Sequence, residues 1–265
     1  MTFPETFAKL HNTYERKALR MLLKEFQALG KKIPYELLTP ENAEGLIRLT
    51  LNEAGLQKVL FKIHLTIGKS YGNLEARRYR KFRERKKFKP LPLFNEAFQA
   101  FLVNYFQTEG GNQITLLTET YVDAVVEEMV KSKIENETVI QMRDRIFKTV
   151  NKPNFYKWQA LRIARTETTF AMNSAAMVSS DASGVVMEKV WYTYRDSRVR
   201  DSHRAMEGKV LPTDELYELP SGVKMRFPGD KAATGGNVVA DLVNCRCSVS
   251  HRAKLDENGL FIFTD

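Results

Sequence analysis

The sequence FYKWQALRIARTETTFAMNSAAMVSSDAS, residues 155–183, separates two parts of the chain that differ in character. It is rich in alanine, the residue with the highest helix propensity, and it stops before Gly184, so it predicts one long helix. Before it, apolar residues recur every three or four positions; after it, short extended pieces alternate with Gly, Pro and Asp. We therefore predict an α+β protein in which this long helix packs on a small, short-stranded sheet.

The periodicity also predicts two domains. A mainly α-helical domain covers residues 1–150, and the break Asn151-Lys152-Pro153 separates it from a smaller α+β domain over residues 151–265. The apolar stripes of the first domain predict helices over residues 7–29, 46–67, 94–106, 114–129 and 137–150. The extended pieces of the second lie at residues 188–195, 209–211, 224–227, 246–251 and 260–263.

Most of the net charge comes from one segment. The 265 residues contain 41 Lys and Arg against 32 Asp and Glu, a formal charge of +9. Residues 77–89, RRYRKFRERKKFK, hold nine cations and one Glu, so this basic segment carries 9 − 1 = +8 and the rest 9 − 8 = +1. A uniformly basic protein is excluded. The candidate nucleic-acid-binding residues are Arg77, Arg78, Arg80, Lys81, Arg83, Arg85, Lys86, Lys87 and Lys89.

Three aromatic residues, Tyr79, Phe82 and Phe88, interrupt the basic segment. Cations at this density neutralise phosphates, and the rings can stack on bases or pack on the protein. Nothing in the pattern fixes bidentate groups on a recognition helix, so sequence-specific reading is not predicted. Two other interpretations stay open: an arm on an acidic protein surface, and a solvated helix face.

The two cysteines, Cys245 and Cys247, cannot form a disulfide framework. The N-terminus is charged from its fifth residue, and no run reaches the 18 apolar residues of a membrane span. We expect a soluble chain, assembled in a reducing cytoplasm, with no membrane partner.

Cys245 and Cys247 could hold a metal, because side chains at i and i+2 of a strand leave the same face. If residues 247–251 are extended, the Cα atoms of Cys247 and His251 are about 13 Å apart, which is too far for both side chains to bind one ion. His203 then remains as a third ligand, with Asp201 as a candidate fourth. The alternative is two small thiols packed under the sheet. We predict no bound metal or cofactor, and retain His203, Cys245 and Cys247 as the candidate ligands.

A catalytic interpretation would pair one thiol with His203 as base, helped by Asp196 or Asp201. No nucleophile elbow, Gly-rich phosphate loop, His-Glu-x-x-His or paired-carboxylate motif accompanies them. We therefore predict a protein that is not an enzyme. The alternatives are a nucleic-acid-processing enzyme that uses His203 with Cys245 or Cys247, and a stand-alone DNA- or zinc-binding module.

A charged residue inside the long helix predicts an internal ion pair. Glu167 lies among apolar helix positions, and a buried charge is costly unless it is paired. We expect Glu167 to pair with Arg198 or Arg200 and so to join the helix to the sheet.

Five separated motifs across roughly residues 137–252 resemble the phage head morphogenesis family, the minor head proteins similar to the Mu F protein. They are Ile163-Ala164-Arg165-Thr166-Glu167-Thr168; Trp191; Asp196-Ser197-Arg198-Val199-Arg200 with His203 and Gly208; Phe227-Pro228-Gly229-Asp230; and Asn244-Cys245-Arg246-Cys247. The signature residues are Arg165, Glu167, Trp191, Asp196, Arg198, Arg200, His203, Gly208, Asn244, Cys245 and Cys247.

The resemblance implies a minor capsid protein of a tailed bacteriophage or prophage that acts at the portal vertex in head assembly, DNA packaging or DNA ejection. The implied partners are the portal protein, the major capsid or scaffolding protein, and DNA. The implied location is the virion, after assembly in the host cytoplasm. The N-terminal helices are the expected contact with the portal. No catalysis is implied.

The resemblance also bears on the metal. Some relatives carry a Cys-x-x-Cys pair and a His-x-x-Cys-x-Cys that look like a zinc site. The corresponding positions here are Arg200, His203, Leu242, Cys245 and Cys247. Two of them, Arg200 and Leu242, are residues that do not bind zinc. We therefore expect Arg200 and its neighbours to replace the metal with ion pairs and hydrogen bonds.

Overall fold

The computed structural model describes residues 3–39, 41–50, 53–84, 94–108, 112–150 and 157–264. The first part of the chain is helical, as the periodicity predicts. Its elements are α1 (Phe3–Gly30), the short 3-10 helix η1 (Tyr35–Leu37), α2 (Ala43–Thr50), α3 (Glu53–Glu84), α4 (Phe94–Thr108), α5 (Asn112–Ile134) and α6 (Val139–Val150).

The second part begins with the long helix α7 (Lys157–Asp181) and continues into short strands. Strands β1 (Met187–Tyr192), β2 (Val210–Pro212) and β5 (Ser248–Ala253) form an antiparallel sheet in the order β2-β1-β5. Strands β3 (Tyr217–Glu218) and β4 (Lys224–Met225) form a separate ribbon, and α8 (Asp201–Arg204) and α9 (Val238–Leu242) lie in the connections. The predicted α+β class, with a mainly helical first part, is confirmed.

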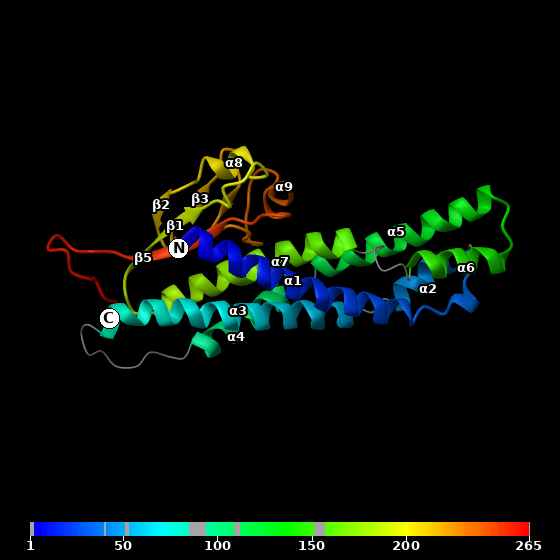
Figure 1. Ribbon diagram of the computed structural model, residues 1–265, viewed down its shortest axis with the longest axis horizontal. Helices are drawn as coiled ribbons and strands as arrows, with labels where there is room; N and C mark the ends of the chain where they lie inside the picture. The colour runs from blue at the N-terminus through cyan, green and yellow to red at the C-terminus, as the bar shows by residue number, and fades with distance from the viewer. Residues whose placement is uncertain are drawn as a thin grey trace.

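α7 lies between the helices and the sheet. One side packs along α1 and α3, and the other contacts β5, an arrangement visible in Figure 1. Because both sides are covered, its side chains are buried almost without interruption from Ala164 to Ala176. One hydrophobic core therefore includes residues from both predicted domains, among them Phe7, Leu22, Ile63, Phe170, Phe227 and Val249. The division at residue 150 remains a prediction from the sequence.

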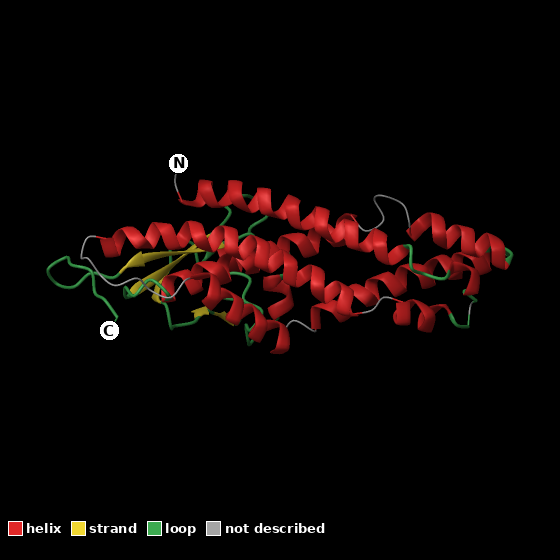
Figure 2. Cartoon of the chain, turned by 90° about the horizontal axis from the view of Figure 1, so that it is seen from below, coloured by secondary structure: helices red, strands yellow, loops and turns green. Residues whose placement is uncertain are grey.

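The molecule is elongated, with the sheet toward one end and the α5–α6 hairpin at the other (Figure 1). Seen from below, the helix that starts at the N-terminus, α1, runs along the outer edge of the bundle (Figure 2). None of the helices in the described ranges is both long and apolar enough to span a bilayer.

The β1 strand organises the small sheet. It pairs with β5 from Met187 opposite Ala253 to Tyr192 opposite Ser248. Its buried Lys189 donates through Nζ to the carbonyl oxygens of Thr213 and Arg226, at 3.2 and 2.9 Å. Burial lowers the pKa of Lys189 to about 8. These bonds hold the ribbon beside the sheet, since a buried ammonium must keep its donors satisfied.

Three details differ from the prediction. The stripe at residues 46–67 belongs to two helices, α2 and α3, and α3 continues into the basic segment as far as Glu84. Residues 260–263 do not form a strand; only isolated bridges join Phe261 to Leu255 and Phe263 to Val185. The two-residue strand β3 was missed, because so short a piece has no detectable alternation.

The packing of α3 on α4 gives a test with two glycines of opposite expected effect. A Cβ at Gly68 would lie 2.0 Å from the ring of buried Phe98, so Gly68→Ala should destabilise the protein by about 1–3 kcal/mol. Gly45 in α2 has no atom within 4 Å of a Cβ, so Gly45→Ala should stabilise by about 0.5–1 kcal/mol. Urea unfolding measures both. A Gly68→Ala protein as stable as the wild type would contradict the packing.

Candidate functional site

Polar side chains of α7 bind the backbone that carries the cysteines. The Thr166 hydroxyl accepts from the Asn244 amide at 3.1 Å, and the Thr169 hydroxyl donates to the Cys245 carbonyl at 2.5 Å. Asn173 donates to the Cys247 carbonyl and accepts from the Val249 amide, both at 3.0 Å. Residues three and four apart on a helix share one face, so these three side chains meet consecutive parts of the segment before and within β5.

Asn244 enters this segment in the left-handed conformation, with φ of 61°. Asparagine tolerates this region better than most residues with a side chain. Its side-chain oxygen accepts from Arg165 at 3.3 Å, while Arg165 also binds both carboxylate oxygens of Glu15 in α1, at 3.0 and 3.1 Å. Two signature residues therefore link α1, α7 and the cysteine segment.

His203, Cys245 and Cys247 lie together, as the metal and catalytic interpretations both required. His203 Nδ1 is 3.6 Å from Cys245 Sγ and 3.4 Å from Cys247 Sγ, and all three side chains are buried. The one-turn helix α8 positions the histidine, and the extended Cys-Arg-Cys places both sulfurs on its side. Trp191 closes the cluster with its ring edge against His203, at a centroid distance of 5.4 Å.

Asp241 of α9 completes the cluster, although no sequence motif pointed to it. One of its oxygens is 3.2 Å from His203 Nε2. Ser202 donates to that oxygen at 2.8 Å, and Ser221 donates to the other at 2.6 Å. The carboxylate is therefore fixed on the side of the ring opposite the sulfurs. Its position four residues before Cys245 is the only sequence signal that could have suggested it.

The cluster shifts the protonation of its members. Burial disfavours a charged imidazole, but Cys245 and Asp241 outweigh it and raise the pKa of His203. A hydrogen bond from Cys247, together with His203, lowers the pKa of Cys245 well below its usual value. The hydrogen bond to Cys245 and burial raise the pKa of Cys247. These shifts favour the thiolate form at Cys245 over that at Cys247.

The geometry of these three donors fits one zinc ion in part. Zn–S bonds of about 2.3 Å and Zn–N bonds of about 2.0 Å place sulfur and nitrogen about 3.6 Å apart in a tetrahedral site. The observed N–S distances are 3.4 and 3.6 Å, and Asp241 on the far ring nitrogen is a typical partner of a metal-binding histidine. A fourth protein ligand does not join the group among the described residues. An ion bound here would join α8 to the start of β5.

Arg200 makes hydrogen bonds to the main chain. Its guanidinium donates to the carbonyl oxygens of Asp241, at 3.5 Å, and Val243. It holds the end of α9 beside the cluster, which agrees in part with the predicted network; its partners are carbonyls and not acidic side chains.

The predicted ion pair of Glu167 with Arg198 or Arg200 is wrong. Both Glu167 oxygens accept from Lys231 Nζ at 2.6 Å, and one is 2.5 Å from His64 Nε2 in α3. Burial alone would raise the pKa of Glu167, but Lys231 and His64 overcome it and lower that pKa to about 2. Arg198 is exposed and pairs instead with Asp196. Lys231 thus binds the Glu167 carboxylate, although Arg198 and Arg200 are nearer in sequence. Arg198 faces solvent, and Arg200 faces main-chain carbonyls.

The Phe227-Pro228-Gly229-Asp230 motif brings Lys231 to Glu167. Asn173 donates to the Pro228 carbonyl at 2.8 Å. Gly229 has φ of 81°, and a Cβ there would lie 3.0 Å from Thr169. Buried Asp230 accepts from the Arg226 side chain and from the amides of Arg226 and Ala232. The motif is a tight turn docked on α7.

Two further signature residues are also structural. Asp196 accepts from Arg246 at 2.8 Å, beside the cysteines. Gly208, with φ of 74°, donates its amide to the Trp191 carbonyl at 2.8 Å and closes the turn before β2.

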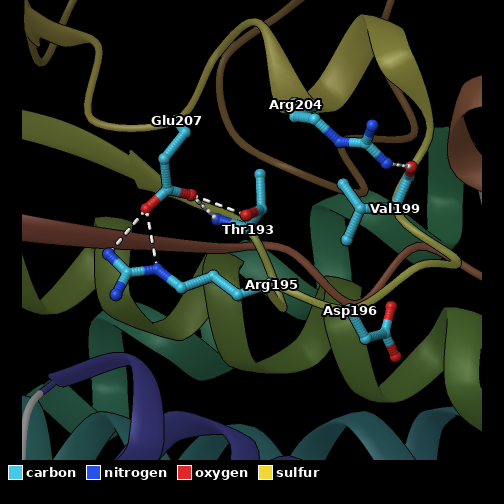
Figure 3. Close-up of a pocket in the computed structure, with 6 residues that line it drawn as sticks. All are labelled: Thr193, Arg195, Asp196, Val199, Arg204 and Glu207. Atoms are coloured by element: carbon cyan, nitrogen blue, oxygen red, sulfur yellow. Dashed lines mark hydrogen bonds and ion pairs between the residues drawn. The ribbon is translucent and has the colours of Figure 1, made fainter.

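A surface hollow near the site lies outside the cluster. It encloses about 390 Å³ and is lined by Thr193, Arg195, Asp196, Val199, Arg204 and Glu207. Figure 3 shows Glu207 between Arg195 and Thr193, with bonds of 2.7 Å to the guanidinium and 2.6 Å to the hydroxyl. Within the hollow Arg195 pairs with Glu207, whereas Asp196 and Arg204 pair with residues outside it. Neither His203 nor the cysteines line it.

The basic segment falls partly outside the described residues. Arg77 and Arg80 are exposed on α3, whereas Arg78 donates to Ser250 Oγ and the His251 carbonyl of β5, at 3.1 and 3.3 Å. Tyr79 is buried and donates to Glu75 at 2.6 Å. Lys81 and Arg83 lie on α3, with side chains that are not described. Arg85, Lys86, Lys87 and Lys89 lie outside the described residues.

Residues 122–250 of the chain match the family model described as Phage Mu protein F like protein. This region belongs to the Mu F-like family of phage minor head proteins.

Two curated proteins are similar over parts of their length. The chain is 32% identical to the "Minor head protein GP7" of Bacillus phage SPP1 over 88 residues, which cover 32% of this chain and 27% of that protein. It is 26% identical to "NAD(+)--arginine ADP-ribosyltransferase EFV" of Enterococcus faecalis (strain ATCC 700802 / V583) over 163 residues, 60% of this chain and 32% of that protein. The chain thus spans about a third or less of either relative. No solved structure matches.

The buried pair at Glu167 gives a stability test. Glu167→Gln removes the buried carboxylate that contacts Lys231 Nζ at 2.6 Å and His64 Nε2 at 2.5 Å, so we expect a loss of about 3 kcal/mol or more in urea unfolding at pH 7. The matched control is Glu188→Gln, which removes the exposed pair with Arg252 and should cost less than about 1 kcal/mol.

The same pair predicts a pH dependence. The folded pKa of Glu167, about 2, lies below its usual value of 4.5, so its stabilising effect is complete above pH 4.5 and is lost as the pH falls toward 2. The stability difference between wild type and Glu167→Gln should therefore shrink over this range. A difference that is constant from pH 7 to pH 3 would contradict the ion pair.

Proposed function

We propose that this chain is a minor capsid protein of a tailed bacteriophage or prophage, acting at the portal vertex in head assembly, DNA packaging or DNA ejection. The match of residues 122–250 to the Mu F-like family carries this proposal, supported by the similarity to a protein named as a minor head protein. The proposed partners are the portal protein and the major capsid or scaffolding protein.

We propose a structural role for the histidine and cysteines. His203, Cys245 and Cys247 are 1–3% exposed, so no substrate of the size of a nucleotide reaches them in this conformation. Several signature residues have partners within the fold: Arg165 binds Glu15, Glu167 binds Lys231 and Asp196 binds Arg246. The 26% identity to an ADP-ribosyltransferase covers a third of that protein and does not carry its activity to this chain.

The basic segment is proposed as the contact with DNA or with an acidic surface of the portal. Arg77 and Arg80 are exposed at its helical start. Arg78 contributes instead to the contact between α3 and β5, so it belongs to the fold.

The structural role can be tested with the triple variant His203→Ala, Cys245→Ala, Cys247→Ala in the phage or prophage that encodes the chain. We expect particles that still form if the variant folds, with a lowered thermal stability of the protein because the cluster loses its internal bonds. Nuclease and transferase assays should give the same result for variant and wild type. A catalytic activity present in the wild type and absent from a folded variant would overturn the proposal.

The basic segment has a separate test. A variant that retains Arg78 and replaces the other cations of the segment with Gln should show a flatter salt dependence of DNA binding. The replaced residues are Arg77, Arg80, Lys81, Arg83, Arg85, Lys86, Lys87 and Lys89. In a plot of log affinity against log salt, the slope should fall by about 0.9 for each phosphate that the variant no longer neutralises. An unchanged slope would assign the segment to a protein partner.

A further inference from the structure

The exposed face of α1 carries a second concentration of positive charge, separate from the basic segment. Between residues 9 and 32 the chain has seven cations and two acids. All seven cationic side chains are exposed: Lys9, Arg16, Lys17, Arg20, Lys24, Lys31 and Lys32.

The helical cations occupy one side of α1. At about 100° per residue, Lys9, Arg16, Lys17, Arg20 and Lys24 fall within roughly 100° of arc, opposite the face that packs on α3 and α7. From Lys9 to Lys24 this basic face is about 22 Å long, at about 1.5 Å per residue, and Lys31 and Lys32 follow directly after the end of α1. Figure 2 shows α1 along the outer edge of the bundle, so this face is open to a partner.

The acids of α1 do not neutralise the basic face. Glu15 binds Arg165 of α7 and is 12% exposed, and Glu25 is half-buried on the packed side of the helix. Glu5 is exposed in the first turn, before the first cation of the basic face. Within the described part of the chain, none of the seven cations is joined to a carboxylate. Unpaired cations that stay in water are free to exchange their counterions for a polyanion.

The composition of the face favours phosphates over a protein partner. Five of the seven cations are lysines, which are depleted in protein–protein interfaces. No large apolar side chain of α1 is exposed, so the face has none of the buried anchors that carry most binding energy between proteins. It has no exposed ring for base stacking, which single strands require. A duplex backbone needs only the cations.

We propose that the basic face of α1 binds the phosphate backbone of double-stranded DNA without reading its sequence. The choice of DNA over another duplex rests on the proposed role in the phage head; the choice of a duplex phosphate backbone rests on the face itself. The N-terminal end of α1 lies beside the helical part of the basic segment, where Arg78 is stacked 5.2 Å over Phe3. The two basic regions therefore lie next to each other at that end.

The test measures binding of the full chain to a 30-base-pair duplex of mixed sequence by fluorescence anisotropy between 50 and 200 mM NaCl. The variant is Lys9→Gln, Arg16→Gln, Arg20→Gln, Lys24→Gln. The matched control removes four exposed cations from other elements: Lys133→Gln, Lys148→Gln, Lys209→Gln, Lys254→Gln. All substituted side chains are exposed, so both proteins should fold with the circular dichroism and melting temperature of the wild type.

We expect the α1 variant to bind the duplex about tenfold more weakly or worse at 100 mM NaCl. Its salt slope should be shallower by about 3.6, since four phosphates are no longer neutralised and each accounts for about 0.9. The control should keep affinity and slope close to those of the wild type. A single strand of the same length should bind the wild type more weakly than the duplex.

Three results would overturn the proposal. The first is an unchanged affinity of the α1 variant, and the second is an equal loss in the control, which would show an effect of net charge alone. The third comes from the same assay with polyglutamate in place of the duplex. If the α1 variant loses binding to polyglutamate while its duplex binding is intact, the face belongs to an acidic protein partner. The proposed role in the phage head has a separate test. It would be contradicted if the protein is absent from purified particles, even while duplex binding by α1 persists.

Discussion

The buried carboxylate of Glu167 determines how the helical part and the sheet of this protein fit together. Glu167 is fully buried in the middle of α7, and its charge is tolerated because Lys231 and His64 contact it. One partner comes from α3, the other from the turn after β4, so neither part satisfies the charge alone. Phe170, one turn further along α7, packs on rings from both parts, Tyr105 and Phe227. The polar requirement and the apolar core therefore act on the same helix.

The sequence motifs of the Mu F-like family acquire a common physical meaning in this arrangement. Thr166, Thr169 and Asn173 bind the backbone of the cysteine segment, and Arg165 joins it to α1. The histidine and the cysteines then meet inside the protein, where a carboxylate oxygen of Asp241 lies 3.2 Å from His203 Nε2. A signature built from such contacts identifies a fold, because each residue is needed to hold another in place. The groups that we propose to bind a partner lie elsewhere, in the basic segment and on the exposed face of α1.

The sequence predicted what depends on local pattern. The α+β class and the long helix that ends before Gly184 follow from periodicity. His203, Cys245 and Cys247 were named from the sequence only as candidate ligands of a metal that was not predicted, and the fold shows that they meet. The partners of Glu167 did not follow, because a helical pattern shows that a charge is internal but not which distant cation reaches it. The basic face of α1 could not be found from the net charge. The 252 residues outside the basic segment have a formal charge of only +1, because acids elsewhere in the chain cancel the cations of α1. Only the fold shows that these charges are apart in space.

The central claim is that α7 makes one cooperative unit of the helical part and the sheet. It can be measured by urea unfolding of a Trp158→Phe protein, in which buried Trp191 beside His203 is the remaining tryptophan and reports on the sheet, while far-ultraviolet circular dichroism reports mainly on the helices. The account predicts that the two signals change together, with the same midpoint and slope. Loss of the Trp191 signal at a urea concentration where the helical signal is intact would contradict it.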